Sequence, residues 1–273
     1  MISKEKLIEL YSAMVMCRMI GEHAERLARN ANLSSSLNAG LGREATIAGI
    51  AVDLRPEDTL ETTRQAFVSN FVKGMPLNVL LAGAARSSNG NGHAGSACAA
   101  AKEHKAAKDG RIAIAYCDAE LTDRGQWRKD LNAAGREDLP VIFVRHRVVN
   151  GAETLKAKRQ PKRAALPEAL EFGVPVIYVD SDDVVAVYRV ASESIARARQ
   201  RRGATLIDCI ANRAASEERA GAGANDVADP IAIMERHLAR NGLFNRGLRK
   251  KITEGFGPQL EKATQALGAA IQQ

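Results

Sequence analysis

The sequence predicts an α/β fold, in which helices cover both faces of a doubly wound, mainly parallel sheet. Short runs rich in β-branched residues alternate with helical patterns in the second half of the chain, which is typical of right-handed β–α–β crossovers. These runs are apolar almost throughout, as expected of strands that are buried on both sides. The runs are RIAIAYC (111–117), VIFVRHRVV (141–149), VPVIYVD (174–180) and ATLIDCIA (204–211).

The expected helices follow from apolar residues at three- and four-residue spacing and from the breakers between them. The first covers 3–30, and its apolar face consists of Leu7, Leu10, Tyr11, Met14, Cys17 and Ala24. Further helices are expected at 42–52, 77–86, 97–108, 125–135, 183–202, 229–242 and 262–271. Ser, Asn and Gly predict a loop over 86–97. We therefore expect a single domain over 1–273, with an N-terminal helix at 1–30 and a C-terminal helical extension at 229–273.

The basic charge of the chain is spread along it rather than gathered in one patch. The net charge is +7 and the isoelectric point is about 9.4. The densest cluster, RARQRR (197–202), lies at the end of a predicted helix, where cations favour the helix dipole and are normally solvated. We therefore expect no nucleic acid partner. No apolar run approaches the roughly 18 residues that a membrane span needs, so we expect no membrane partner either.

Cysteine usage predicts the redox environment. The chain has four cysteines, none of them in a C-x-x-C pair, and each has apolar or alanine-rich neighbours. They are Cys17, Cys98, Cys117 and Cys209. With no signal peptide after Met1, we interpret them as reduced core residues of a cytoplasmic protein.

A polar junction follows the first predicted strand. The stretch YCDAELTDRG (116–125) begins at a strand-to-helix turn, where anions and metal-bound phosphates sit in α/β proteins. It carries the acids Asp118, Glu120 and Asp123, and its only glycine, Gly125, comes late. Two interpretations of Asp118 are open, a metal ligand and a helix cap. Capping is favoured, because Asp is common at that position whatever else it does.

Arg145 and Arg147 form a second candidate site, at the carboxyl end of the second predicted strand. This edge is the default ligand edge of a doubly wound sheet. Guanidinium groups there suit a phosphate or carboxylate that binds without a metal. In the alternative, favoured interpretation, the two side chains alternate along the strand end and point to solvent.

The histidines offer few positions for chemistry. His23, His104 and His237 lie on predicted helices and are expected at the surface, whereas His93 lies in the glycine-rich loop and His146 ends a strand. Only the last two are placed to carry protons, and no Cys or Asp spacing makes either of them a metal ligand.

Several passages carry a likeness to a known family. They are GREATIAGIAVDLRPED (42–58), LNAAGREDLPVIFV (131–144), VIYVDSDDVVAVYRV (176–190) and DPIAIMERHL (229–238). In this order they resemble the alpha subunit of thiamine-diphosphate-dependent 2-oxo acid dehydrogenases, the pyruvate, branched-chain and acetoin group. The likeness covers most of the chain and implies the thiamine-diphosphate-binding fold. Glu44 looks like the family's glutamate, although an acid in a first helical turn is common without any function.

The same resemblance implies that the cofactor site has lost most of its ligands. The family holds magnesium and the diphosphate with a Gly-Asp-Gly turn and an Asn-Asn pair further along the chain. Glycines let the backbone approach the diphosphate, and Asp and Asn supply oxygen ligands to magnesium. Here the turn reads Cys117-Asp118-Ala119, which keeps Asp118 as a vestigial metal ligand. The distal pair falls near Arg147 and Val148, whose side chains offer no oxygen.

Two further motifs of the family have lost their histidines. After a Thr-Thr pair the family shows Tyr-Arg-Asp-His-Gly-His, whereas Phe67 and Ser69 stand at the histidine places here. Neither side chain is a suitable proton carrier. The family's Tyr-Arg-Gly-His-Ser motif reads NRAAS (212–216), again without the histidine.

These losses predict a degenerate, non-catalytic homologue, a pseudoenzyme of an oxidoreductase family with a structural or interaction role. We expect no catalytic residue and no cofactor, and either a homodimer or a beta-subunit-like partner. The first alternative is an active thiamine-diphosphate-dependent subunit that acts on 2-oxo acids with a beta partner and needs thiamine diphosphate and magnesium. The second is a metal-free anion- or phosphate-binding protein that uses Arg145 and Arg147.

Overall fold

A parallel sheet of five strands forms the centre of the protein, in the order β1-β2-β3-β5-β4. The structure is a computed structural model and describes residues 2–30, 40–86, 94–118, 124–149, 167–212 and 229–271. The strands are β1 (Thr59–Glu61), β2 (Ala113–Asp118), β3 (Val141–Val149), β4 (Val176–Asp180) and β5 (Thr205–Asn212). Every strand pair in the sheet is parallel, so the predicted doubly wound α/β fold is confirmed. The first strand was not predicted, because three residues are too few to show a pattern.

Helices surround the sheet and continue beyond it as a separate layer. They are α1 (Lys4–Asn30), α2 (Glu44–Ala51), α3 (Ser69–Val72), α4 (Leu77–Arg86), α5 (Ala94–Ala107), α6 (Arg124–Arg136), α9 (Pro167–Glu171), α10 (Val184–Arg199), α12 (Pro230–Arg240), α13 (Arg246–Ile271) and the 3-10 helix η1 (Arg64–Ala66). Helix α5 begins inside the predicted loop over 86–97, since residues 94–97 are already helical. Residues 87–93 lie outside the described part of the chain.

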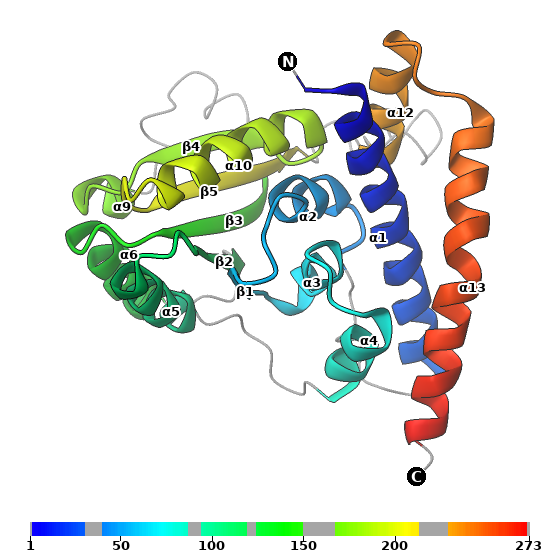
Figure 1. Cartoon of the computed structure of the whole chain (residues 1–273), viewed down its shortest axis with the longest axis horizontal. Coiled ribbons are helices and arrows are strands. Elements are labelled where there is room, and N and C mark those ends of the chain that lie inside the picture. Colours follow the sequence, from blue (N-terminus) through cyan, green and yellow to red (C-terminus); the bar gives the residue numbers. More distant parts are fainter. Residues whose placement is uncertain are drawn as a thin grey trace.

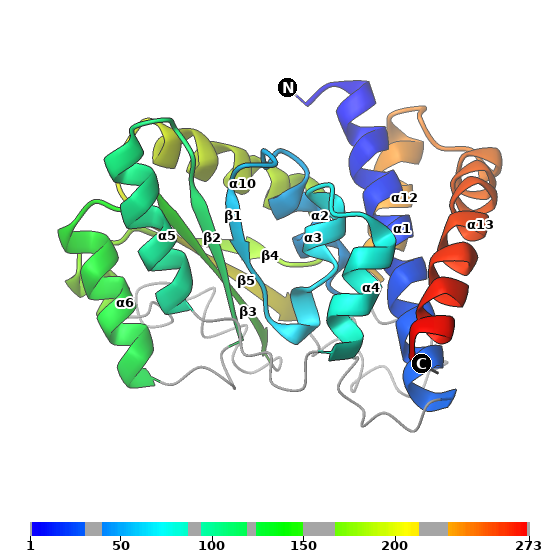
Figure 2. The same ribbon diagram turned by 60° about the horizontal axis from the view of Figure 1, so that its bottom comes forward.

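Alternation along the strands divides the sheet into two buried faces (Figure 2). On one face, Phe143 of β3 packs with Trp127 and Leu131 of α6, in a cluster that α5 and α9 complete. On the other face, Ile142 packs with Val187 of α10, in a cluster that includes residues of α2. Both faces are apolar because helices cover them both, which is why the strands lack a polar alternation along most of their length.

The two ends of the chain build a helical layer at one side of the sheet. Helices α1 and α13 lie side by side there, with α12 close to the first half of α1 (Figure 1). Leu10, Tyr11 and Met14 of α1 are completely buried in this layer, as their spacing predicts. Helix α12 starts at Pro230, and the side chain of Asp229 accepts a hydrogen bond from the Ile231 amide as its N-cap.

One glycine is required by a close backbone approach. A Cβ on Gly135 of α6 would lie 1.8 Å from the carbonyl oxygen of Phe172, at the end of α9. No side chain fits in that space, so glycine lets α6 pack against this turn.

Two buried polar groups tie helices to the first strand. The carboxylate of Asp58 is fully buried and accepts two hydrogen bonds from Arg199. Nη1 donates to Oδ1 at 3.2 Å, and Nη2 donates to Oδ2 at 2.7 Å. Part of the basic cluster at 197–202 is therefore an internal ion pair, rather than only solvated charge. His104 is 6% exposed and lies 2.9 Å from the Thr59 hydroxyl, so its predicted surface position was wrong.

The cysteines are buried thiols, in agreement with their apolar sequence context: Cys17, Cys98, Cys117 and Cys209. Burial raises the pKa of both Cys98 and Cys209 to about 12, so these thiols stay protonated at neutral pH. Within the described ranges, no helix has both the length and the apolar character that crossing a membrane would require.

Candidate functional site

The candidate arginines lie on the central strand β3 and face the same side of the sheet as Phe143. Arg145 is the register partner of Asp208 on β5, and Arg147 is two residues further along the same face. Leu206 also belongs to this face, so Asp208 continues an otherwise apolar row of β5. The alternation that buries Phe143 and Leu206 therefore brings one acid and two bases together towards the carboxyl ends of β3 and β5.

Asp208 binds both arginines. Its side chain is fully buried, and it accepts two hydrogen bonds from Arg145, Nε to Oδ1 at 2.9 Å and Nη2 to Oδ2 at 2.8 Å. Arg147 Nε donates to Asp208 Oδ2 at 3.0 Å. The side chains of Arg145 and Arg147 are only 13% and 20% exposed. The expectation that they point to solvent was therefore wrong, because a buried carboxylate holds them against the sheet.

The charges of this cluster do not balance. Among the residues that the structure describes, two guanidinium groups share one carboxylate, which leaves one net positive charge in a mostly buried place. Arg147 Nη2 is buried and has no hydrogen-bond acceptor among the residues that the structure describes. The buried hydroxyl of Tyr178 is likewise unpaired in the described part of the chain, and Tyr178 is the register partner of Asp208 on β4.

Tyr178 is held neutral by its surroundings. Burial and then the charge of Asp208 raise the pKa of its hydroxyl, whereas the charges of Arg145 and Arg147 oppose this shift. The Tyr178 hydroxyl is therefore a hydrogen-bond donor at neutral pH. Together, Arg147 and Tyr178 offer two donors without a described acceptor next to an excess positive charge.

The metal-ligand prediction for Asp118 is not decided by the geometry. Asp118 is the last residue of β2, and its backbone pairs in register with His146 of β3. Its side chain lies outside what the structure describes, as do residues 119–123, so both the metal-ligand and the capping interpretations remain predictions. Among the described residues, no group of three or more His, Cys, Asp or Glu side chains is arranged to hold a metal ion.

Ser69 and Phe67, which the resemblance sets at the histidine places of the family motif, are buried and partly buried. Ser69 is completely buried at the start of α3, and Phe67 packs against a cluster formed with α1, α4 and α13. His146 is 7% exposed, at the strand end where the sequence places it. Residues 213–216 and His93 lie outside the described residues.

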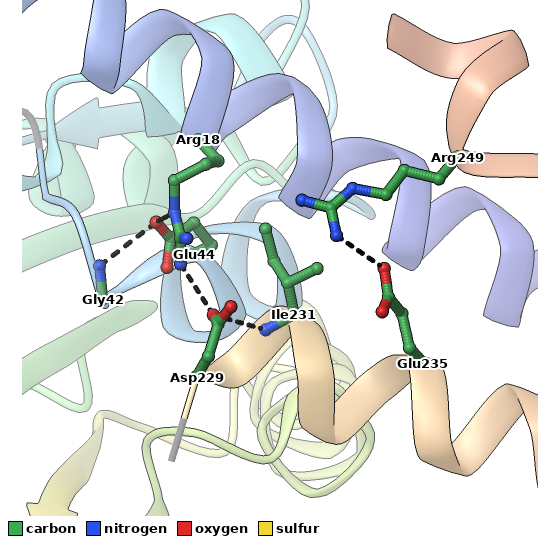
Figure 3. A network of polar contacts seen from close by, with 7 residues as sticks. All are labelled: Arg18, Gly42, Glu44, Asp229, Ile231, Glu235 and Arg249. Carbon is green, nitrogen blue, oxygen red and sulfur yellow. Dashed lines mark hydrogen bonds and ion pairs between the residues drawn. The ribbon is translucent and has the colours of Figure 1, made fainter. Parts of the chain in front are cut away.

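A second polar cluster surrounds Glu44 and joins three helices (Figure 3). The Glu44 side chain is 1% exposed, and its Oε1 accepts hydrogen bonds from Arg18 Nε of α1, at 2.5 Å, and from the Gly42 amide, at 3.1 Å. Arg18 Nη2 donates to Asp229, the N-cap of α12, at 2.8 Å. Sequence reasoning found Glu44 but not its partners, because Arg18 and Asp229 are 211 positions apart in the chain. No local spacing signals such a contact.

Acidic residues gather near this cluster and change the titration of Asp182. Burial, and then the negative charges of Asp180, Glu44 and Asp229, raise the pKa of Asp182 from 3.8 to about 6. The Ser181 hydroxyl, 3.2 Å away, donates to Asp182 and opposes the shift. The ionised form of Asp182 is therefore disfavoured in the folded state.

Replacing Asp182 with asparagine is expected to stabilise the protein at neutral pH and not at acidic pH. A carboxyl whose pKa is raised on folding destabilises the fold above its folded pKa, about 6, and has no such effect below its unfolded pKa, near 3.8. Because the side chain is partly exposed, we expect a gain of about 1–2 kcal/mol at pH 7 and almost none at about pH 3, which lies below the unfolded pKa. Urea denaturation at both pH values measures this difference.

As a control, Glu57→Gln at an exposed position should change the free energy of unfolding by less than about 0.5 kcal/mol at either pH. An equal gain from Asp182→Asn at both pH values would contradict the prediction.

A cavity lies apart from both clusters. It has a volume of about 270 Å³ and lies between the start of α10 and α12. Its lining consists of Asp183, Val184, Val185, Ile233, Met234, Arg236, His237 and Arg240. It therefore includes none of the residues around Asp208 or Glu44.

Comparison with known proteins agrees with the fold and with the resemblance of the sequence. Relatives include the chloroplastic pyruvate dehydrogenase E1 component subunit alpha-3 of Arabidopsis thaliana, with 24% identity over all of this chain and 73% of the relative. The alpha subunit of acetoin:2,6-dichlorophenolindophenol oxidoreductase from Cupriavidus necator has 25% identity over 99% of this chain and 92% of the relative. The pyruvate dehydrogenase E1 component subunit alpha of Staphylococcus aureus has 23% identity over the whole chain and 79% of the relative.

A sequence model of the family described as dehydrogenase E1 component matches residues 88–270. This match covers most of the sheet, together with the C-terminal helices. The chain therefore belongs to the dehydrogenase E1 component family, as a relative of the alpha subunits of 2-oxo acid dehydrogenases.

Proposed function

We propose that this chain is a non-catalytic member of its family, a pseudoenzyme with a structural or interaction role. The observation that carries the proposal is the pairing of Arg145 and Arg147 with Asp208. In the resemblance, the family's Asn pair, which supplies an oxygen ligand for magnesium, falls near Arg147 and Val148. A guanidinium group only donates hydrogen bonds and repels a cation, so the described residues at this edge of the sheet do not suit a magnesium–diphosphate group.

The loss of proton carriers supports the same proposal. Phe67 and the buried Ser69 occupy the histidine places of the family motif, and neither exchanges protons near neutral pH. In thiamine-dependent chemistry the cofactor carries the difficult step, and the protein binds it and orients it. A chain without the metal ligands and without these histidines keeps the fold of the family and little of the machinery that orients the cofactor.

The proposed role is to hold another protein chain, either a second copy in a homodimer or a beta-subunit-like partner. This proposal is supported by the names of the relatives, which are alpha subunits and therefore parts of larger assemblies. Sedimentation at micromolar concentration tests the first form and is expected to show a dimer. A monomer that stays monomeric, and that does not bind a beta subunit of a relative, would contradict the proposed role.

Calorimetry tests the loss of the cofactor site. Thiamine diphosphate with magnesium is titrated into the protein, alone and mixed with a beta subunit, with an active alpha subunit of the family as the positive control. We expect no heat of binding in either case. Magnesium-dependent binding at micromolar affinity would overturn the proposal and favour an active thiamine-diphosphate-dependent subunit acting on 2-oxo acids.

A further inference from the structure

The cluster around Asp208 has the features of an incomplete ion pair. Asp208 accepts two hydrogen bonds from Arg145, one on each carboxylate oxygen, and a third from Arg147 Nε. Removing a guanidinium group from water is unfavourable unless its donors find acceptors and its charge is balanced. Arg147 meets neither condition fully, because its Nη2 is buried without a described acceptor and Asp208 is already neutralised by Arg145.

A second unsatisfied donor lies in the same neighbourhood. The Tyr178 hydroxyl is buried without a described partner, although most buried polar groups in proteins have one. Tyr178 is opposite Asp208 in the register of β4 and β5, and the charges of Arg145, Arg147 and Asp208 all act on it. A group that satisfied both Arg147 Nη2 and the Tyr178 hydroxyl would be a hydrogen-bond acceptor, and a negative charge on it would balance the second guanidinium group.

We propose that Arg147 and Tyr178 bind a small oxyanion, a phosphate or carboxylate group, without a metal ion. One oxygen accepts from Arg147 Nη2 and another from the Tyr178 hydroxyl, while Asp208 and Arg145 hold Arg147 in place. The negative charge of the ligand balances the second guanidinium group. Arg147 lies two residues before the carboxyl end of β3, and Tyr178 lies in the middle of β4. The site is therefore in the half of β3 that leads to the edge at which doubly wound sheets bind ligands. This inference is independent of the proposed interaction role, because an anion site needs neither magnesium nor a partner chain.

The contribution of each donor sets the expected effects. A hydrogen bond to a charged group contributes about 1.5–3 kcal/mol, so Arg147→Gln should weaken oxyanion binding by about ten- to a hundredfold. A neutral hydrogen bond contributes less, and Tyr178→Phe should weaken binding by about two- to tenfold. Arg128→Gln is the matched control, because Arg128 is an arginine of α6 that pairs with the exposed Glu171 rather than with Asp208, and it should not change binding.

Thermal unfolding and calorimetry test the site on the full chain in the presence of EDTA. Inorganic phosphate, acetate and chloride are compared at equal ionic strength. We expect phosphate or acetate at millimolar concentration to raise the melting temperature of the wild type and of Arg128→Gln, with a smaller rise in Tyr178→Phe and the smallest rise in Arg147→Gln. The more effective of the two anions identifies the ligand as a phosphate or as a carboxylate.

Two results would overturn the inference. The first is that neither anion shifts the melting temperature of the wild type beyond the effect of chloride. The second is an equal shift in the wild type and in Arg147→Gln. Arg147→Gln is expected to fold, because it leaves the balanced pair of Arg145 and Asp208, and circular dichroism checks this. Should it not fold, Tyr178→Phe decides, and unchanged affinity in that variant would contradict the site.

Discussion

Asp208→Asn is expected to lower the free energy of unfolding by about 3–5 kcal/mol, the usual effect of removing one partner from a buried ion pair. Asp208 is fully buried and is the described acceptor for three hydrogen bonds from Arg145 and Arg147. An asparagine has the same shape but no charge, so both guanidinium groups lose their countercharge while they remain mostly buried. Urea denaturation followed by circular dichroism measures the loss. A change below about 1 kcal/mol would show that the pairing does not stabilise the fold.

Three further variants separate charge balance from packing at this position. Asp109→Asn is the control, because Asp109 pairs with Arg111 at the surface, where an ion pair contributes little to stability. Adding Arg147→Gln to Asp208→Asn removes one unpaired cation and should recover part of the loss. Replacing Arg145, Arg147 and Asp208 together with Met, Met and Leu should come close to wild-type stability, because an apolar set of similar volume avoids the desolvation of charge.

Arg18→Met is expected to destabilise the protein by about 3 kcal/mol, by the same physical argument. Arg18 is the described cationic partner of Glu44, whose side chain is 1% exposed, and it also binds the N-cap residue Asp229. Without Arg18, the Glu44 carboxylate keeps, among the described residues, only the hydrogen bond from the Gly42 amide, and the N-cap residue of α12 loses its ion pair with α1. Methionine preserves most of the apolar stem of the side chain, so the loss reports on the charge.

Arg249→Met is the matched control for this experiment. Arg249 pairs with Glu235 at 3.1 Å (Figure 3), but its side chain is 49% exposed. Glu235 also accepts a hydrogen bond from the Tyr11 hydroxyl. We expect a loss below about 1 kcal/mol. The double variant Arg18→Met/Glu44→Gln should be more stable than Arg18→Met alone, because the buried negative charge is removed with its partner. Equal losses in Arg18→Met and Arg249→Met would rule out a special role for the Glu44 cluster.

The sequence predicted the fold class and most elements because apolar periodicity is a local property. Helix α1 and strand β3 lie within a residue of the predicted ranges, since long apolar patterns determine which face is buried. The helices over 94–107 and 246–271 are longer than predicted, since alanine, glycine and charged residues give no clear period there. His104 was misplaced because its burial depends on Thr59, a residue of the strand that was not predicted.

The sequence by itself determined the family, the alternation of strands and helices, and the two positions on β3 that carry arginine. Only the tertiary structure decided what those arginines do. Arg145 and Asp208 are 63 positions apart, and their contact depends on the register between β3 and β5. The register is set by the packing of the whole sheet. A shift of β5 by one residue relative to β3 would turn Asp208 to the other face of the sheet. The sequence could therefore place two cations at a ligand edge, but not the buried acid that holds them there, nor the positive charge that this acid leaves unbalanced within the described ranges.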